Sequence, residues 1–137
     1  MKITICGSMA FSKKMIEVKQ ELEKLNHQVV LPKFTEEYAK METIDKVHTE
    51  SAKNKVDHDL IREYFNEIKE TDAILVVNED KNGTKDYIGG NSFLEMGFAH
   101  ILNKKIFLLY NIPEIGYKDE IEAMQPISLN NDLTKIK

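Results

Sequence analysis

The sequence predicts a three-layer α/β fold in which helices cover both faces of a doubly wound sheet of about five mostly parallel strands. Short apolar runs of strand length alternate along the chain with longer segments whose apolar residues recur at helical spacing. The run at residues 73–77, AILVV, is apolar throughout, which is typical of a central parallel strand covered on both faces. Strands and helices that alternate in this way form parallel sheets through right-handed crossovers.

The amino-terminal part of the chain is predicted to form a strand, a helix and a second strand. Residues 3–6 are apolar and end at Gly7-Ser8, and the following segment keeps apolar residues at helical spacing as far as Leu25. A polar turn ends this helix, and residues 28–31 form the second strand. A Gly-Ser turn after a first parallel strand lies where doubly wound sheets hold phosphates or sugars.

The remaining elements are predicted from the same two kinds of pattern. A highly charged helix with mobile parts is expected over residues 33–55, and a helix with a firmer apolar stripe from residue 56 to about residue 70. The later elements are a helix from about residue 91, a strand at 106–110, a short helix at 118–124 and an edge strand at 126–129.

A fold of this kind, flavodoxin-like or Rossmann-like, binds ligands beyond the carboxyl ends of its strands. No repeat, low-complexity tract or linker interrupts the pattern, so residues 1–137 are predicted to form a single domain. We expect the turn at Gly7-Ser8, the loop after Val77 and Asn111 to converge at this edge of the sheet.

Composition and charge narrow the class of protein. A formal net charge of −4 and a pI near 5.6 argue against binding to nucleic-acid polymers or anionic membranes, because both recognise basic surfaces. No apolar run approaches the ~20 residues that cross a bilayer, and no signal-peptide core precedes the first strand. The sequence therefore predicts a soluble cytoplasmic protein. The single cysteine, Cys6, excludes an internal disulfide and is expected to be a buried thiol.

The stretch GGNSFLEMGFA at residues 89–99 has the features of a ligand-binding helix start. Its two glycines let the backbone approach a ligand closely, and Asn91 or Ser92 is expected to cap the helix. The free N–H groups of the first turn would then point at the ligand. Glu95 follows one turn later, near the end of the helix where the dipole favours an ionised carboxylate.

Two further expectations concern the packing of this helix. Phe93, Phe98 and Ile101 are expected to face the sheet. Gly97 is expected to let the helix and a strand approach each other closely.

One cluster, Asp57-His58-Asp59, has the residue types of a metal site. Neighbours in sequence point to different sides of a helix, and no other His or Cys has ligand spacing with them. The sequence therefore predicts neither a bound metal nor an organic cofactor.

The segment GNSFLEMGFA at residues 90–99, followed by NKKI at residues 103–106, resembles the signature of the nucleoside 2-deoxyribosyltransferase family. That signature is a glycine, small or aromatic residues, Glu, an apolar residue, Gly, an aromatic residue and Ala, before a Lys-rich turn into a strand. Residues 71–73 and, more loosely, residues 5–8 extend the similarity over most of the chain, with one strong motif. The family includes 2′-deoxynucleoside 5′-phosphate N-hydrolases.

The resemblance implies cleavage or transfer at the N-glycosidic bond of a nucleoside or nucleotide. In both branches of the family the motif glutamate, here Glu95, attacks the anomeric carbon and forms a glycosyl ester, which a second base or water resolves. The family often has an Asp on the helix before the third strand to serve the departing base, and here the register places Tyr64 there. Asp59, Glu63 and Tyr64 itself are the alternatives for this role. The first loop, at residues 9–11, also lacks the additional Gly and Arg residues of the phosphate-hydrolase branch.

Further residues and a partner are expected from the same reasoning. A homo-oligomer is expected because family members commonly complete the pocket from a neighbouring subunit, and the apolar segment at residues 127–136 is the expected interface. The residues expected to line the sugar or phosphate pocket are Gly7, Ser8, Gly89, Gly90, Asn91 and Ser92.

Two rival hypotheses stand beside the enzyme. The first is a catalytically inactive binding or sensor module for a nucleotide derivative, which keeps the fold and the pocket but lacks turnover because Tyr64 stands where the family has an Asp. The second is a structural partner protein that has no affinity for small ligands.

Overall fold

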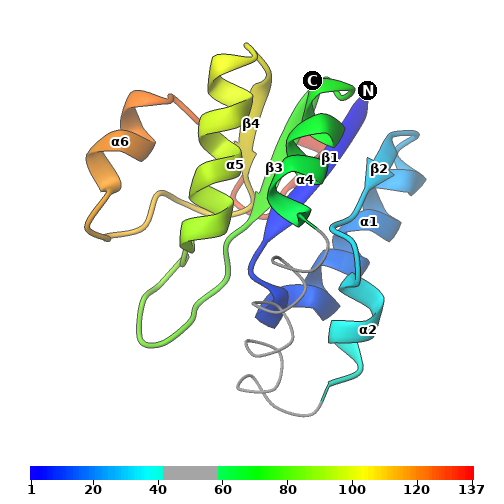
Figure 1. The fold of residues 1–137 in the computed structure, drawn as a ribbon, viewed down its shortest axis with the longest axis horizontal. Coiled ribbons are helices and arrows are strands. Elements are labelled where there is room, and N and C mark those ends of the chain that lie inside the picture. Colours follow the sequence, from blue (N-terminus) through cyan, green and yellow to red (C-terminus); the bar gives the residue numbers. More distant parts are fainter. Residues whose placement is uncertain (42–58) are drawn as a thin grey trace.

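Five parallel strands form the centre of the structure, a computed structural model that describes residues 1–41 and 59–137 (Figure 1). Every neighbouring pair of these strands is parallel. Across the sheet they lie in the order β2 (Gln28–Val30), β1 (Lys2–Gly7), β3 (Ala73–Val77), β4 (Lys105–Leu108) and β5 (Ile127–Ser128). The predicted fold class, a three-layer α/β fold with about five mostly parallel strands, is confirmed.

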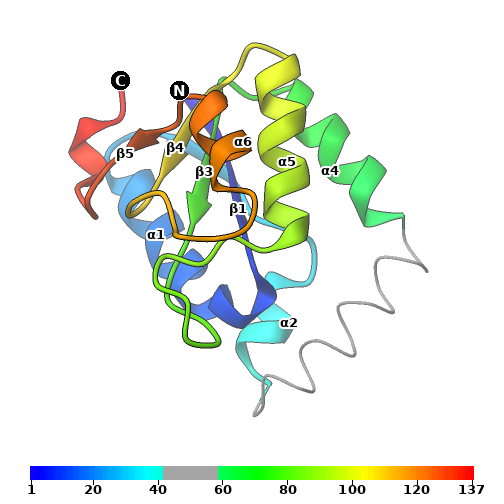
Figure 2. The same ribbon diagram turned by 90° about the vertical axis from the view of Figure 1, so that its left-hand side faces the viewer.

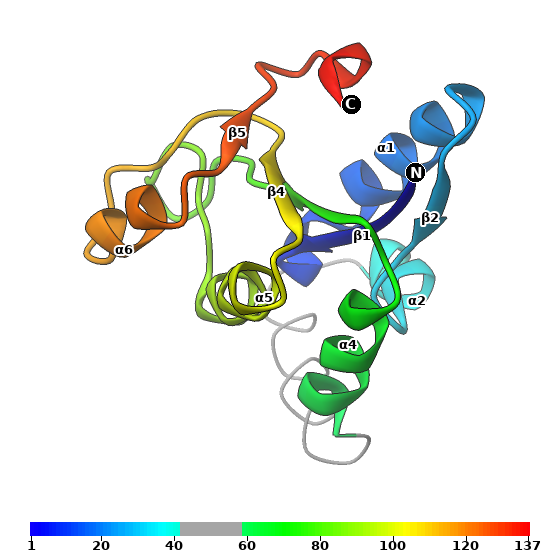
Figure 3. The same ribbon diagram turned by 90° about the horizontal axis from the view of Figure 1, so that it is seen from above.

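Helices cover both faces of this sheet, as Figure 2 and Figure 3 show from two sides. One face carries α1 (Ser12–Lys24), the 3-10 turn Met9–Phe11 before it and the 3-10 turn Leu133–Lys135 near the C-terminus. The opposite face carries α4 (Leu60–Lys69) and α5 (Gly90–Ile101). The two short helices are α2 (Thr35–Ala39), which follows β2, and α6 (Lys118–Ala123), which borders α5. No helix in the described ranges is both long enough and apolar enough to span a bilayer.

The alternation of side chains along the strands divides the core into two halves. Ile5 points to the α1 side of the sheet, where it belongs to the same buried cluster as Met15. Cys6, the next residue of β1, points to the other side and packs with Val76 and Ile68 of α4. Each face of β1 and β3 is therefore covered by helices, which explains why the run predicted as the central strand is apolar throughout.

The order of the strands reverses between β1 and β3, and folds of this kind form their ligand crevice at the carboxyl ends of the strands beside such a point. Gly7, the last residue of β1, lies opposite Val77, the last residue of β3. A Cβ at Gly7 would come within 3.0 Å of the Met15 sulfur and 3.1 Å of the Val77 carbonyl oxygen. The glycine is required because α1 and β3 both approach the backbone at this point.

Helix α5 begins at Gly90, and Gly89 occupies the capping position. No side chain accepts a capping hydrogen bond there, so the prediction that Asn91 or Ser92 caps the helix is wrong. Both residues lie inside the helix instead: Ser92 is buried against the protein, and Asn91 faces a cavity.

The side of α5 that faces the sheet also differs from the prediction. Phe93 and Phe98 are half-buried at the edges of the core, but Ile101 is 78% exposed, so the prediction that Ile101 faces the sheet is wrong. Gly97 does not serve a close approach to a strand either, because a Cβ there would meet nothing within 4 Å. The residues of α5 that are buried are Ser92, Glu95, Met96 and Ala99.

The C-terminal segment packs on the chain's own core. Leu129, Leu133 and Ile136 are at most 6% exposed and belong to the cluster beneath α1. The expectation that the apolar side chains of residues 127–136 form a subunit interface is therefore wrong for these three. The homo-oligomer itself stays a prediction.

Three predictions from the sequence fall partly outside the described residues. Only α2 is described from the helix predicted at residues 33–55, and the helix predicted from residue 56 is described from Leu60 onward. Of the cluster Asp57-His58-Asp59, only Asp59 lies within the described part of the chain.

Candidate active site

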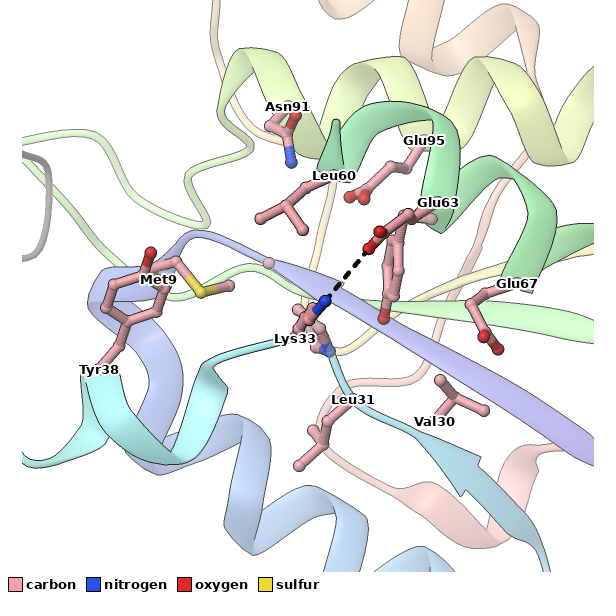
Figure 4. A pocket seen from close by; sticks show the side chains of 13 residues that line it. Met9, Val30, Leu31, Lys33, Tyr38, Leu60, Glu63, Glu67, Asn91 and Glu95 are labelled. Carbon is pink, nitrogen blue, oxygen red and sulfur yellow. Dashed lines mark ion pairs between the residues drawn. The ribbon is translucent and has the colours of Figure 1, made fainter. Parts of the chain in front are cut away.

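A cavity of about 320 Å³ lies beyond the carboxyl ends of β1 and β2 (Figure 4). Its walls come from the ends of these two strands, from α2 and from the facing sides of α4 and α5. The residues that line it are Gly7, Met9, Val30, Leu31, Pro32, Lys33, Tyr38, Leu60, Glu63, Tyr64, Glu67, Asn91 and Glu95. The position agrees with the ligand-binding edge predicted for a doubly wound sheet.

Glu95 contributes a carboxylate to this cavity from the second turn of α5. Its side chain lines the cavity while the residue as a whole is only 6% exposed. Asn91 lies one turn earlier on the same side of the helix and also lines the cavity, as Figure 4 shows. The helix therefore presents an amide and a carboxylate together, on a rigid element.

The thiol of Cys6 lies near enough to Glu95 for the charge of the carboxylate to act on it. Cys6 is completely buried, as predicted. Burial, and next the negative charge of Glu95, raise the pKa of the Cys6 thiol well above its usual range. The thiol therefore stays protonated at neutral pH.

Tyr64 lines the cavity with its ring, but its hydroxyl already donates its one hydrogen bond within the protein. The hydroxyl donates a hydrogen bond to the backbone carbonyl of Ile5, and the residue is 8% exposed. Burial is the main cause that raises the pKa of Tyr64, and the nearby Cys6 and Glu95 raise it further. Tyr64 therefore remains a neutral phenol that ties α4 to β1.

The three remaining carboxylates of interest on or before α4 occupy different surroundings. Asp59 is exposed, forms an ion pair with Arg62 and does not line the cavity. Glu63 and Glu67, one turn apart, both line it. Glu63 lies 3.8 Å from the Lys33 ammonium, and Figure 4 marks this ion pair with a dashed line. Glu67 and Lys33 were missed by the sequence analysis.

Of the six residues expected to line the pocket, Gly7 and Asn91 do so and four lie outside the lining. The Ser8 hydroxyl accepts hydrogen bonds from the Ala10 backbone N–H (3.3 Å) and from the Lys81 ammonium (3.0 Å). Ser8 thus caps the first 3-10 turn.

The other three residues of that set are Gly89, Gly90 and Ser92. A Cβ on Gly89 would come within 3.2 Å of the Tyr87 ring, so this glycine makes room for an aromatic side chain. Gly90 is exposed at the start of α5, and Ser92 is buried on the side of the helix that faces the protein.

An apolar wall lies opposite α5 and was not predicted. Met9 follows β1, Leu31 and Pro32 follow β2, and Tyr38 is a buried residue of α2. The signal that could have found the first three is their position directly after a parallel strand, the same rule that pointed to Gly7. Tyr38 could not have been found in this way because its place depends on how α2 packs.

No group of three or more His, Cys, Asp or Glu side chains within residues 1–41 and 59–137 is arranged to hold a metal ion.

Comparison with known proteins gives matches in structure but not in sequence. No protein-family model and no curated protein matches this chain. A CMP N-glycosidase from Clostridium botulinum, BcmB, superposes with a TM-score of 0.50 and 15% sequence identity, over 95% of this chain and 90% of that one. The chain has the fold of this N-glycosidase.

A 2-deoxyribosyltransferase from Bacillus psychrosaccharolyticus gives a weaker superposition. Its TM-score is 0.47 at 23% identity, over 79% of this chain and 71% of that one. The likeness in fold therefore rests on the N-glycosidase alone.

Proposed function

We propose that this protein cleaves or transfers the N-glycosidic bond of a nucleoside or nucleotide, ribose or deoxyribose, through a covalent glycosyl ester on Glu95. The observation that carries the proposal is a buried carboxylate on a rigid helix, lining a cavity beyond the carboxyl ends of parallel strands. The shared fold with a CMP N-glycosidase supports it.

The chemistry explains why a carboxylate is needed at this place. As the bond between C1′ and the base nitrogen breaks, its electron pair leaves with the base and positive charge builds on the sugar. A Glu95 oxygen stabilises that charge and bonds to C1′. Water, or the nitrogen of a second base, then attacks C1′ and releases the carboxylate, and two displacements retain the configuration of the sugar. No step requires a metal or an organic cofactor.

Of the three residues that could hold or protonate the departing base, Asp59, Glu63 and Tyr64, we choose Glu63. Tyr64 donates its hydroxyl hydrogen bond to the Ile5 carbonyl, and Asp59 is paired with Arg62 and does not line the cavity. Glu63 lines the cavity and is oriented by Lys33. A carboxyl group there could hold or protonate a ring nitrogen of the base.

The apolar wall supports the same assignment of substrate. Met9, Leu31 and Tyr38 present hydrocarbon and an aromatic ring opposite the polar residues of α5. A flat heterocycle gains contact with such a wall while its sugar faces Glu95 and Asn91.

The direct test is to incubate the protein with a panel of nucleosides and nucleotides and to follow the free base by chromatography. Wild type should release base, and Glu95→Gln, which keeps the size of the side chain, should lose about 10³-fold or more in kcat. Glu63→Gln should reduce kcat more than Glu67→Gln, its matched control one turn along α4. No release by wild type, or equal release by Glu95→Gln, would defeat the proposal.

The second candidate function is a binding or sensor module without turnover. It is favoured by Tyr64, which stands where the family often has an Asp and whose proton is engaged by the backbone. Calorimetry with nucleosides, nucleotides and ADP-ribose-like ligands separates the two: tight binding without release of base indicates the sensor.

A further inference from the structure

We propose that Lys33 and Glu63 together recognise the base of the substrate and select one that carries an amino group beside a ring nitrogen acceptor. Cytosine and adenine have this arrangement, and their oxo counterparts uracil and hypoxanthine do not. This inference rests on the proposed function, the cleavage or transfer of an N-glycosidic bond. Glu63 keeps its place beside the departing base, and Lys33 gains a role in specificity besides that of orienting Glu63.

The two charged groups lie side by side in the lining of the cavity. Lys33 follows β2, Glu63 lies in the first turn of α4, and both residues line the cavity. The Lys33 ammonium is 3.8 Å from the Glu63 carboxylate, in the ion pair drawn in Figure 4. This distance suits an ion pair but is too long for a direct hydrogen bond. Each group can therefore exchange a hydrogen bond with a ligand while the two charges stay together.

Contacts near Lys33 hold its ammonium at this place. The turn that contains Lys33 is closed by a hydrogen bond from the Thr35 backbone N–H to the Pro32 carbonyl (3.2 Å). The ammonium also lies 5.6 Å from the centroid of the Phe34 ring, which is within the range of a cation–π contact. An aromatic ring and a carboxylate thus hold the ammonium together.

A carboxylate beside an ammonium offers a hydrogen-bond acceptor next to a donor. The carboxylate only accepts hydrogen bonds, and the ammonium only donates them. Cytosine and adenine are complementary to this pair, because each places an amino donor beside a ring nitrogen acceptor. In uracil and hypoxanthine an oxo group replaces the amino group, and the neighbouring ring nitrogen carries a hydrogen. An oxo base would therefore turn an oxygen toward Glu63 and an N–H toward Lys33, and neither hydrogen bond could form.

The rest of the lining agrees with a base in this position. Leu31 and Tyr38 offer apolar and aromatic contact to the flat faces of a base. The sugar would then lie toward α5, which carries Glu95 and Asn91. The edge of the base and the sugar therefore meet side chains from different elements, so one can be varied without the other.

The first test uses wild type alone. Cytidine and uridine are offered together, and adenosine and inosine together, each as ribo- and 2′-deoxyribonucleosides with and without a 5′-phosphate. Release of each base is followed by chromatography, and kcat/KM should be about tenfold to a hundredfold higher for the amino base of any pair that is cleaved. Equal release, or a preference for the oxo base, would overturn this inference and leave the proposed function standing. No release from any substrate would defeat the proposed function, and this inference with it.

The second test measures binding without turnover, in a Glu95→Gln background that leaves the substrate intact. Calorimetry should give a Kd about tenfold or more lower for the amino nucleoside than for its oxo counterpart. Lys33→Met should lose most of this preference. Lys19→Met, which breaks an ion pair with Glu23 (3.1 Å) on α1 outside the cavity lining, is the matched control and should keep it.

Exchanging the two charges gives the sharpest outcome. The double variant Lys33→Glu with Glu63→Lys places the donor and the acceptor in the opposite order, so it should bind the oxo nucleoside more tightly than the amino one. Both side chains are about half exposed, 52% and 51%, so the exchange should not impair folding. A preference that stays unchanged in Lys33→Met or in the double variant would overturn the assignment.

Discussion

Asn78 is the residue that joins the loops around the site. It is fully buried directly after β3, and its side-chain amide donates hydrogen bonds to the carbonyls of Asp86 (3.3 Å) and Asn111 (2.7 Å). Its side-chain carbonyl accepts one from the Tyr110 backbone N–H (3.0 Å). The sequence correctly placed the loop after Val77 and Asn111 together, but the contact uses the Asn111 backbone rather than its side chain.

Removing this side chain should be costly because three backbone groups would lose their partner in a buried place. We expect Asn78→Ala to lower the free energy of unfolding by about 2–4 kcal/mol, measured by urea denaturation. Asn66→Ala, on the exposed side of α4, is the control and should change it by less than about 0.5 kcal/mol. Similar losses in both variants would show that the hydrogen bonds of the Asn78 side chain do not stabilise the fold.

The raised pKa of Cys6 predicts a loss of stability at alkaline pH. The folded protein keeps the thiol proton at a pH at which the unfolded chain, with an ordinary pKa of about 8.5, has lost it. The contribution of the buried Cys6 thiol to the free energy of unfolding is therefore complete below about pH 8.5. Above that pH it decreases by up to about 1.4 kcal/mol per pH unit. Tyr64, whose pKa is also raised, adds a similar loss above about pH 10.

This pH dependence can be measured by urea denaturation at about pH 7 and about pH 9.5. Cys6→Ser has no group that titrates in this range, so it should lose less stability than wild type between the two values. An identical loss in the two proteins would mean that burial does not hold the Cys6 proton.

At the scale of elements, α5 shows why an apolar helix is hard to orient from sequence. Its inward side is formed by Met96 and Ala99 together with Glu95, while Leu94 and Ile101 are exposed. Apolar residues thus occupy both sides of the helix, so their spacing does not indicate which side meets the sheet. Only the packing of α5 against β1 and α4 decides that Glu95 faces the cavity.

Two glycines in different elements should respond in opposite ways to the same substitution. Gly97 lies inside α5 with open space around a Cβ, so Gly97→Ala should stabilise the protein by about 0.5–1 kcal/mol. Gly7→Ala brings a Cβ within 3.1 Å of a backbone oxygen and should destabilise it by about 1–3 kcal/mol. Thermal unfolding of both variants tests this pair, and a destabilised Gly97→Ala would reveal a packing role in an assembly.

At the scale of the whole molecule, one part of the surface carries few charged side chains. A groove of about 590 Å³ runs between α4, α5 and α6, and among the described residues that line it only His100 and Glu120 are ionisable. Leu94 and Ile101 line it and are 47% and 78% exposed. Two copies of a chain with a net charge of −4 repel each other least where few charges meet.

The predicted homo-oligomer should therefore use this groove rather than the C-terminal segment. We expect sedimentation at micromolar concentration to show a species larger than the monomer, and Ile101→Glu to shift it toward the monomer by placing a charge in the interface. Ile61→Glu, an exposed apolar position on α4 outside the groove, is the control and should leave the distribution unchanged. A monomer in wild type would contradict the prediction.

The order of elements and the choice of Glu95 as a candidate that lines the cavity followed from local patterns. An apolar run such as residues 73–77 has few alternatives to a central strand, and the glycine-rich motif before Glu95 is specific. The prediction that Asn91 or Ser92 caps the helix was wrong. Whether Ser92 caps the helix or is buried depends on the sheet against which α5 packs.

The sequence by itself determined the succession of strands and helices, and with it the parallel sheet and the edge at which the cavity lies, because periodicity and turn residues act over a few neighbouring positions. The tertiary structure alone decided which side chains meet at that edge. Gly7, Glu63 and Glu95 come from three separate elements, and no local pattern encodes their meeting around one cavity. That meeting arises only when α4 and α5 pack beside the end of β1.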